Sequence, residues 1–402
     1  MDNSKLVLII ALAAYGKGIS GGDRIYIEFA RRWSKRFKVC VFVWEEGYEM
    51  CKRQQLDKSL VKFKISKLKK WSILGFVINY FVRIIEGIRL GLITKLTDNG
   101  TSTIVYSSSE FLMDVIPAFI LKIRYPKLNW AASWYQTAPS PLVGFRIGNR
   151  KDKYRTSALI YWLSQRFTMP FIKLLSDFVL VNNDNEKNFF PKHNKKGKVV
   201  VVLGAVDTEN ICYWIEKNKK LPKTYDAVFQ GRFHAQKGVV ELISVWKKVV
   251  KNIPNATLAM IGDGPLMENV KRKIQELNLA NNIKLFGYVF DGDQKYKIFS
   301  QSKIVVHPAF FDSGGMAAAE AMAFSLPCIG FNLPSYKYYY PKGMVKIKKY
   351  DIDAFAKTVT NLLENNDERM KIGKEAHDLV INNMSWNRRS EEIIDAIITK
   401  IK

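Results

Sequence analysis

The 402-residue sequence predicts an α/β protein made of two domains. The chain is about twice as long as the upper end of a typical single domain, so two separate cores are expected. Leu6–Ile10 is a continuous apolar run, as in a strand that is buried on both faces of a helix-covered parallel sheet. Another strand-like run, Asp226–Gln230, starts the same alternation again in the second half. The polar, Lys-rich segment 211–223 between the halves is the predicted linker.

The net charge of +26 is the most unusual feature of the composition, with 63 Lys and Arg against 37 Asp and Glu. A charge of this size favours polyanionic surroundings, namely nucleic acid, an anionic membrane face or phosphorylated substrates. It does not choose among the three. A biased genome in the source organism would also produce a high Lys content.

Cysteine usage and hydropathy indicate a cytoplasmic protein. The four cysteines show no C-x-x-C spacing, so neither a disulfide framework nor a zinc site is predicted. Leu6–Ala14 resembles the core of a signal peptide but is only nine residues long and runs directly into a glycine-rich turn and an amphipathic helix, so it is interpreted as the first buried strand. The apolar run Trp71–Val82 is stopped by Arg83 and Glu86, short of a membrane span. Any membrane contact is therefore expected to be peripheral, at the inner face of the cell membrane.

A glycine-rich turn follows the first strand. Gly16, Gly18 and Gly21 spell G-x-G-x-x-G, and Glu45 follows the second strand at about the distance of a ribose-binding acid. This pattern makes a nicotinamide oxidoreductase one alternative. The additional Gly22 permits a broader loop than the dinucleotide fingerprint requires.

Two segments of the first half combine basic and bulky apolar residues. One runs from residue 52 to residue 95 and joins a row of lysines to the apolar run that begins at Trp71. This composition is typical of a segment on an anionic lipid surface, although a strand and a core helix with solvated lysines would also explain it. The other, 142–176, is interpreted as an acceptor-side or membrane-facing element, with core packing as the alternative. Their basic residues are Lys58, Lys62, Lys64, Lys67, Lys69, Lys70, Arg146, Arg150, Lys151, Lys153 and Arg155.

The stretch 303–332 carries the strongest functional pattern. A short buried strand ends at Pro308, and the turn Asp312–Gly315 leads into the Ala-rich helical run Met316–Phe324. Gly314 and Gly315 lie where a helix N-terminus exposes unpaired amides, which is an anion site. An ordinary N-cap formed by Asp312 is the alternative.

Asp312 and Glu320 lie eight positions apart, just over two helical turns. Both carboxylates can therefore approach one ligand from different ends, one near a sugar and the other near a ribose. A capped helix with one surface Glu is the alternative.

With its two acids, its Gly-rich turn and the small-Pro-hydrophobic strand that follows, this stretch resembles the signature of retaining glycosyltransferases of the GT-B fold, family 4. The family has Glu where this chain has Asp312, which shortens the reach by one methylene. The resemblance implies two Rossmann-like domains facing across a cleft. Residues 1–210 would bind the acceptor, 224–384 would bind the nucleotide sugar, and 385–402 would form a helix that crosses back to the first domain.

The resemblance also assigns roles to residues. Arg232 and Lys237, in the loop after the strand that ends at Gln230, match the family's diphosphate clamp and would act in catalysis with Asp312. Asp312 would hold sugar hydroxyls or stabilise the cationic anomeric carbon, and Glu320 would bind the ribose. The leaving phosphate would take the acceptor proton, so that no separate base is needed. Further donor contacts would come from Gly314, Gly315, Met316, Gly21, Gly22 and Gly262.

The acceptor side departs from the family. Where many members have a His, this chain offers Tyr135 or Gln136, which become the acceptor-side candidates. Asp291-Gly292-Asp293 spells D-x-D, a metal motif of another glycosyltransferase fold, but its place before a helix predicts an N-cap. No metal and no cofactor are therefore expected, because the nucleotide sugar is a substrate. Tyr336–Tyr340 falls where the family has a loop.

The predicted function is a retaining glycosyltransferase that uses a UDP- or GDP-linked sugar and a glycan or lipid-linked acceptor at the cytoplasmic membrane face. Besides the oxidoreductase, one further alternative remains, a protein that binds nucleic acid or another polyanion through a degenerate transferase-like core. The sequence has no recognised nucleic-acid motif, so no specific nucleic-acid partner is expected.

Overall fold

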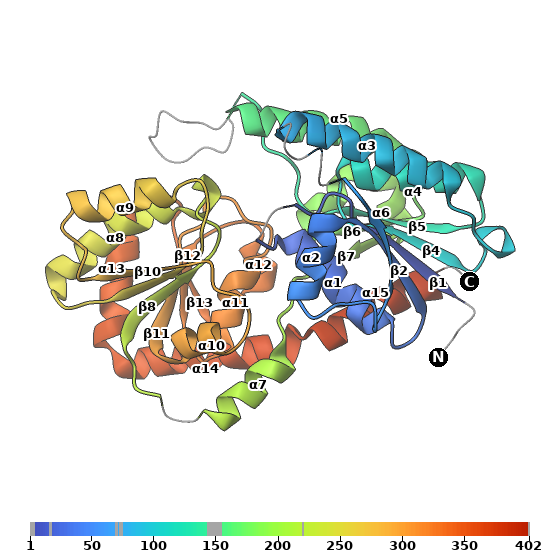
Figure 1. Cartoon of the computed structure of the whole chain (residues 1–402). Coiled ribbons are helices and arrows are strands. Elements are labelled where there is room, and N and C mark those ends of the chain that lie inside the picture. The colour runs from blue at the N-terminus through green and yellow to red at the C-terminus, as the bar shows by residue number, and fades with distance from the viewer. Residues whose placement is uncertain are drawn as a thin grey trace. The chain divides into compact units, whose positions relative to one another are not determined.

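The computed structural model describes residues 5–15, 18–68, 71, 75–142, 155–218 and 221–400. The chain forms two compact α/β units (Figure 1). The first unit contains most of the chain before Gly204 and the chain from Asn387 onward, and the second unit contains Gly204–Trp386. The predicted fold class of two α/β units is confirmed, whereas the predicted cleft stays a prediction.

The first unit is built on a seven-stranded sheet with the strand order β3-β2-β1-β4-β5-β6-β7, in which all neighbouring strands are parallel. Its strands are β1 (Leu6–Ile10), β2 (Lys38–Trp44), β3 (Lys62–Ser66), β4 (Thr103–Ser107), β5 (Asn129–Trp134), β6 (Phe178–Val181) and β7 (Val199–Val201). Its helices are α1 (Gly21–Trp33), α2 (Glu45–Arg53), α3 (Phe76–Ile93), α4 (Leu112–Arg124), α5 (Arg155–Leu175), α6 (Pro191–Lys195) and α15 (Trp386–Thr399).

Both faces of the first sheet are covered by helices. Strand residues such as Leu8 share a buried apolar cluster with α3, α4 and α5. On the opposite face, Trp33 of α1 packs edge-on against Tyr106, and its Nε1 donates to the Ser390 carbonyl of α15 at 2.9 Å. Because β1 is buried on both faces of the sheet, its sequence is continuously apolar and does not alternate between apolar and polar residues.

The second unit is built on a six-stranded parallel sheet with the order β10-β9-β8-β11-β12-β13. Its strands are β8 (Tyr225–Gln230), β9 (Leu258–Ile261), β10 (Ile283–Gly287), β11 (Ser302–His307), β12 (Cys328–Phe331) and β13 (Met344–Ile347). Its helices are α7 (Thr208–Lys217), α8 (Val239–Asn252), α9 (Met267–Glu276), α10 (Asp293–Ser300), α11 (Met316–Met322), α12 (Tyr336–Tyr339), α13 (Ile352–Glu364) and α14 (Asn366–Asn383).

In each sheet the strand order reverses once, between β1 and β4 in the first unit and between β8 and β11 in the second. At such a switch point the loops that follow the two strands turn to opposite faces of the sheet. The space outside the carboxyl ends of these strands is where open α/β sheets bind ligands. The two topologies therefore place one potential ligand site in each unit.

Two segments form helices that the sequence did not predict. Most of the predicted linker is helical, because α7 covers Thr208–Lys217 and buries Ile211 and Trp214. Tyr336–Tyr339 forms the short helix α12, where a loop was expected. The last helix, α15, belongs to the first unit, where Arg36 forms ion pairs with Glu391 and Asp395. Among the described residues, no helix is both long and apolar enough to cross a membrane.

Gly262 allows the loops that follow β8 and β9 to meet. Its φ is +141°, and a Cβ added there would lie 1.9 Å from the carbonyl oxygen of Gly231. Its N–H donates to the Gly287 carbonyl at 2.7 Å. A side chain at this position would therefore push apart two loops of the switch-point edge.

Replacing Gly262 with Ala should lower the free energy of unfolding by about 3 kcal/mol, because backbone strain and a steric clash add. Gly287→Ala is the matched control, since Gly287 also has a positive φ (+66°) but has open space around its Cβ position. It should cost only about 1 kcal/mol. Urea unfolding of both variants measures the difference, and equal losses would contradict the predicted clash.

Candidate functional site

The candidate site of the second unit lies at the switch point between β8 and β11. The loop after β8 carries Arg232 and Lys237, and the loop after β11 carries Asp312. The two loops touch closely, since the N–H of Phe310 donates to the Gln236 carbonyl at 2.7 Å. Gly238 has φ +63°, and a Cβ there would lie 2.1 Å from the Pro308 carbonyl oxygen. The fold thus brings the three predicted catalytic residues into one small region.

Asp312 is the centre of this region. Its Oδ2 lies 2.5 Å from Lys237 Nζ and 3.0 Å from His307 Nε2, and only 7% of its side chain is exposed. Burial would raise the pKa of Asp312, but the charge of Lys237 and the hydrogen bond from His307 outweigh it and hold the pKa well below its usual range. Asp312 is therefore ionised at neutral pH. Sequence reasoning missed His307, although its place at the end of a buried strand was a signal.

The turn after Asp312 is held by the same carboxylate. Asp312 Oδ1 accepts from the amides of Gly314 and Gly315 at 3.2 and 3.0 Å. Two of the amides predicted to face the donor thus point at Asp312, and their donor role stays a prediction. Gly315, with φ +63°, is the N-cap of α11, and Met316 is its first residue.

Tyrosines of the α12 region support this turn from behind. Tyr340 donates through its hydroxyl to the Gly314 and Gly315 carbonyls at 3.0 and 2.7 Å. A Cβ at Gly314 would lie 2.5 Å from the ring of Tyr339, and Tyr339 accepts from the Gly204 amide at 2.9 Å. The aromatic cluster therefore fixes the backbone that carries Asp312, instead of forming an open loop.

Glu320, the predicted ribose ligand, is buried and held by partners that the sequence did not reveal. Its Oε2 lies 2.7 Å from Lys295 Nζ and 3.0 Å from Gln230 Nε2. Lys295 is itself only 1% exposed and also pairs with Asp291. Lysine is almost never fully buried unless it is paired. The alternative of a surface Glu is wrong, while the ribose contact stays a prediction.

The D-x-D segment does not form the predicted N-cap. The N-cap of α10 is Gly292, and no side chain caps it. Asp291 is instead the partner of Lys295, and Asp293 accepts from Trp214 Nε1 at 2.7 Å. In the part of the chain that the structure describes, no three His, Cys, Asp or Glu side chains gather as metal ligands.

Arg232 gives the region an uncompensated positive charge. It is exposed, and within the described residues its guanidinium has no hydrogen bond or ion pair. Burial, with added repulsion from Arg232 and Lys237, lowers the pKa of the neighbouring His234 to about 4. Because the cations oppose a further positive charge, the loop after β8 favours an anion.

The glycines predicted to contact the donor from the first unit start α1. Gly21 and Gly22 occupy its first turn, behind Ser20, whose side chain accepts from the Asp23 amide while Asp23 accepts from the Ser20 amide. A Cβ at Gly22 would lie 3.7 Å from the Tyr135 ring, so these two predicted residues are neighbours. Gly16 lies outside the described residues.

Of the two acceptor-side candidates, Tyr135 is buried and Gln136 is partly exposed. Tyr135 is 5% exposed, and its hydroxyl lies 2.5 Å from that of Tyr106. Burial and the charge of Tyr106 raise the pKa of Tyr135 well above its usual value. The Gln136 carbonyl accepts from Tyr161 and Gln165 at 2.7 and 2.6 Å. Tyr135 therefore acts mainly by packing.

Two buried acids at the switch point of the first unit were missed. Asp114 accepts from the amides of Leu12 and Ala13 at 2.7 and 3.1 Å and from Ser109 Oγ at 2.5 Å, which ties the loop after β1 to the loop after β4. Burial raises its pKa to about 7. Burial also raises the pKa of Glu110, which accepts from the Tyr161 hydroxyl. An acid soon after a buried strand was the available signal.

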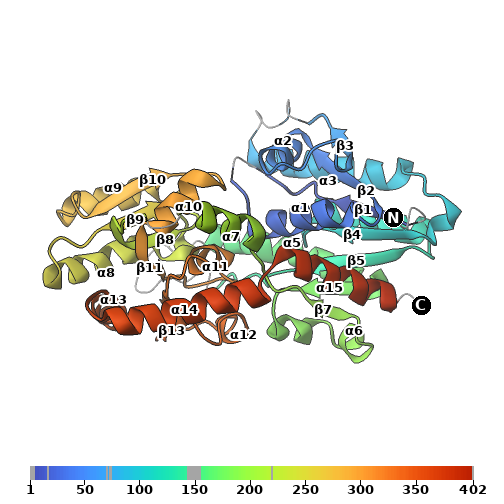
Figure 2. The same cartoon turned by 90° about the horizontal axis from the view of Figure 1, so that it is seen from below.

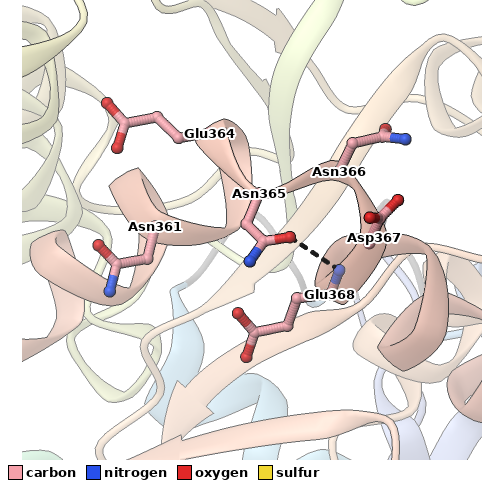
Figure 3. A pocket seen from close by; sticks show the side chains of 6 residues that line it. All are labelled: Asn361, Glu364, Asn365, Asn366, Asp367 and Glu368. Atoms are coloured by element: carbon pink, nitrogen blue, oxygen red, sulfur yellow. Dashed lines mark hydrogen bonds between the residues drawn. The ribbon is translucent and has the colours of Figure 1, made fainter.

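An open polar hollow at the junction of α13 and α14 is unrelated to this chemistry (Figure 3). Asn365 accepts there from the Glu368 amide at 3.0 Å and caps α14. Its carboxylates would repel an anionic donor. The hollow, of about 560 Å³, is lined by Asn361, Glu364, Asn365, Asn366, Asp367 and Glu368.

Residues 212–379 match the model of the family described as Glycosyl transferases group 1. The second unit belongs to this family. Among curated relatives, the poly(glycerol-phosphate) alpha-glucosyltransferase of Bacillus subtilis is 24% identical over 50% of this chain and 28% of its own length. The Escherichia coli UDP-Gal:alpha-D-GlcNAc-diphosphoundecaprenol alpha-1,3-galactosyltransferase is 24% identical over 51% of this chain and 55% of its own length. The chain thus spans less than two thirds of these relatives.

Solved structures show the GT-B fold for nearly the whole chain. Anabaena HepE in complex with UDP and glucose matches with a TM-score of 0.70 and 12% identity, over 98% of this chain and 100% of that chain. A point mutant of Staphylococcus aureus TarM matches with a TM-score of 0.73 and 11% identity, over 98% of this chain and 99% of that chain. At this identity the likeness concerns the fold alone.

The low pKa of His234 predicts a pH-dependent stability. Because the unfolded ring takes up a proton near pH 6.5 and the folded ring only near pH 4, the free energy of unfolding should fall as the pH drops from 6.5 to 4. The loss should be on the order of 1–2 kcal/mol for a partly screened ring. Urea unfolding across this range should show a shallower fall in His234→Gln and an intermediate one in Arg232→Ala. An unchanged slope in His234→Gln would contradict the assignment.

Proposed function

We propose that this chain is a retaining glycosyltransferase that moves a sugar from a UDP- or GDP-linked donor to a glycan or lipid-linked acceptor at the cytoplasmic membrane face, without a metal ion. The observation that carries the proposal is the ion pair of Lys237 and Asp312 at the switch point of the second unit, with Arg232 exposed in the same loop. Family membership of residues 212–379 supports the reaction class.

The donor diphosphate would bind against the loop after β8. Arg232 offers a planar set of N–H donors to phosphate oxygens. Lys237 has three N–H donors and uses one on Asp312, so that it can bridge the carboxylate and a phosphate. Gly262 lets the neighbouring loop approach this edge, and Glu320, fixed by Lys295, would receive the ribose hydroxyls.

Asp312 would act on the sugar. When the bond between the anomeric carbon and the diphosphate oxygen breaks, positive charge develops on the carbon and negative charge on the leaving phosphate. The ionised Asp312 stabilises the first, while Arg232 and Lys237 stabilise the second. The acceptor oxygen forms the new bond on the face that the diphosphate leaves, and its proton passes to a phosphate oxygen. No separate protein base is needed.

The relatives support the choice of ligands. HepE was solved with UDP and glucose, and the E. coli relative is named for UDP-Gal and a diphosphoundecaprenol-linked acceptor. The B. subtilis relative is named for a poly(glycerol-phosphate) acceptor. UDP-sugars are therefore the first donors to test, with lipid-linked and polymeric acceptors after them.

Donor binding should stabilise the protein in a thermal-shift experiment with UDP-, GDP- and ADP-sugars. One nucleotide should raise the melting temperature equally with and without EDTA, by the equivalent of about 2.7 kcal/mol at a hundredfold excess over Kd. Arg232→Ala should weaken its binding about ten- to hundredfold, because a charge-assisted contact is lost.

Arg272→Ala is the matched control, since Arg272 is an exposed arginine of the same unit, with 68% of its side chain exposed, on α9. It should bind the donor like the wild type. No shift with any nucleotide sugar would overturn the donor assignment. A shift with NADH alone would favour the nicotinamide alternative, and tight binding of duplex DNA that persists at physiological salt would favour the polyanion alternative.

Asp312→Asn should separate chemistry from binding. Loss of the negative charge beside the reacting carbon should lower kcat about 10²- to 10³-fold while donor affinity changes little. Asp312→Glu, which supplies the family's usual acid, should retain much more activity. Single-turnover transfer and calorimetric donor binding measure the two effects. Equal kcat in the two variants would contradict a role for the carboxylate.

A further inference from the structure

The helices α3 and α5 of the first unit expose an extended apolar surface. Half of the large apolar side chains that are exposed in the described part of the chain lie on these two helices, including Phe81 at 59% and Phe167 at 62%. An exposed apolar area of this kind usually marks an interaction site. We call it the outer face. It consists of Val77, Ile78, Phe81, Ile85, Ile88, Leu92, Ile93, Leu159, Ile160, Leu163, Phe167 and Leu174.

The polarity of α3 is inverted relative to an ordinary surface helix, which buries its apolar side. The buried side of α3 carries Asn79, Arg83 and Glu86. Arg83 donates to Asn79 Oδ1 at 2.7 Å and to the Leu12 carbonyl at 3.1 Å. Glu86 accepts from Ser66 Oγ at 2.5 Å. Apart from Asn79 Nδ2, the polar groups of these three side chains have partners inside the unit, and among the described residues of α3, Leu90 is the large apolar side chain that is fully buried beside them. Most of the apolar side chains of α3 therefore face outward.

Helix α5 shows the same inversion beside it. It buries Ser164, Gln165 and Thr168 and exposes Leu163 and Phe167. The hydroxyls of Tyr80 on α3 and Ser164 on α5 lie 2.9 Å apart, and the two helices run next to each other in Figure 1. The two apolar stripes therefore belong to one surface.

The outer face is fixed in orientation by tight packing of α3 on α4. A Cβ at Gly87 would lie 2.9 Å from the Met113 carbonyl oxygen, and one at Gly91 would lie 3.0 Å from Ile120 Cβ. Helix α3 cannot roll its apolar side inward without losing this contact and the buried network of Arg83. Something outside the described unit must therefore remove the outer face from water.

The charges around the outer face indicate the partner. The only acid on α3 is the buried Glu86, and the sequence of α5 contains no acid. Exposed cations lie on the two helices and on the adjoining segment before α3, where Ser66 of β3 contacts Glu86. A second copy of this chain, with its net charge of +26, would bring like charges together. The cations are Arg89, which pairs with Glu86, together with Arg166, Lys173 and Lys67.

We propose that the outer face of α3 and α5 docks this protein on an anionic lipid bilayer, with its apolar side chains among the acyl chains and its cations at the headgroups. Apolar burial and attraction to anionic lipid act together at such a surface. The inference deepens the proposed function, because it names the surface that would place the active unit next to a lipid-linked acceptor.

The test is co-flotation of the full chain with vesicles of phosphatidylcholine containing 30% or no phosphatidylglycerol. The wild type should bind the anionic vesicles and lose at least tenfold in affinity on neutral vesicles or at high salt. The double variant Phe81→Glu/Phe167→Glu should bind anionic vesicles at least tenfold more weakly. Tyr213→Glu/Met370→Glu is the matched control, with the same added charge at positions that are 65% and 66% exposed in the second unit, and it should bind like the wild type.

Each outcome decides the proposal. Equal vesicle binding by the two double variants would overturn docking through the outer face. A concentration-dependent dimer in sedimentation velocity that only the Phe81/Phe167 variant abolishes would assign the face to a second copy instead. A cooperative thermal unfolding transition, measured on every variant, confirms that the protein is folded, and donor binding by calorimetry distinguishes failure of the proposed function from failure of docking. Vesicle binding without donor binding would refute the proposed function and leave docking intact, and the reverse result would refute docking alone.

Discussion

The ion pair between Lys237 and Asp312 is the interaction on which the candidate site depends. It joins two loops that are 75 residues apart in sequence, and both partners are at least partly withdrawn from water. Removing one partner of such a pair leaves an uncompensated charge, which costs more than the pair contributes. The pair also sets the chemistry, because Lys237 and His307 keep Asp312 ionised in spite of its burial. Structure and the proposed reactivity thus rest on the same contact.

Both units have a buried carboxylate that connects two loops at the switch point. In each one, a buried carboxylate from the loop or helix after one strand holds the neighbouring loop, through Asp312 in the second unit and Asp114 in the first. The environments differ, however. Lysine and histidine surround Asp312 and lower its pKa, whereas burial dominates at Asp114 and raises its pKa to about 7. One topology therefore carries a carboxylate paired with cationic side chains in one unit and a buried, weakly acidic carboxylate in the other.

The inverted helices α3 and α5 show how strongly packing decides which side of a helix faces water. Sequence composition around Trp71 indicated either a lipid-facing segment or a core helix, and 142–176 left the same choice open. The structure supports neither a fully buried α3 nor a fully buried α5, since each helix buries several polar side chains beside a few apolar ones and exposes most of its large apolar side chains. The basic residues Lys69, Lys70, Arg146, Arg150, Lys151 and Lys153 lie outside the described residues.

The sequence by itself determined the local elements and brought forward the candidate residues of the second-unit site. Apolar runs, helix propensity and the spacing of Asp312 and Glu320 are local properties, and they predicted β1, β8, β11 and α11 closely. Only the tertiary structure decided the partners: His307 for Asp312, Lys295 for Glu320, and Tyr339 and Tyr340 for the turn between them. Partners follow from strand order and loop packing, which bring distant segments together, and no periodicity along one segment encodes them. The D-x-D segment illustrates the difference. Its place before a helix predicted an N-cap, but Asp291 instead forms an ion pair with the buried Lys295, one turn later in the chain.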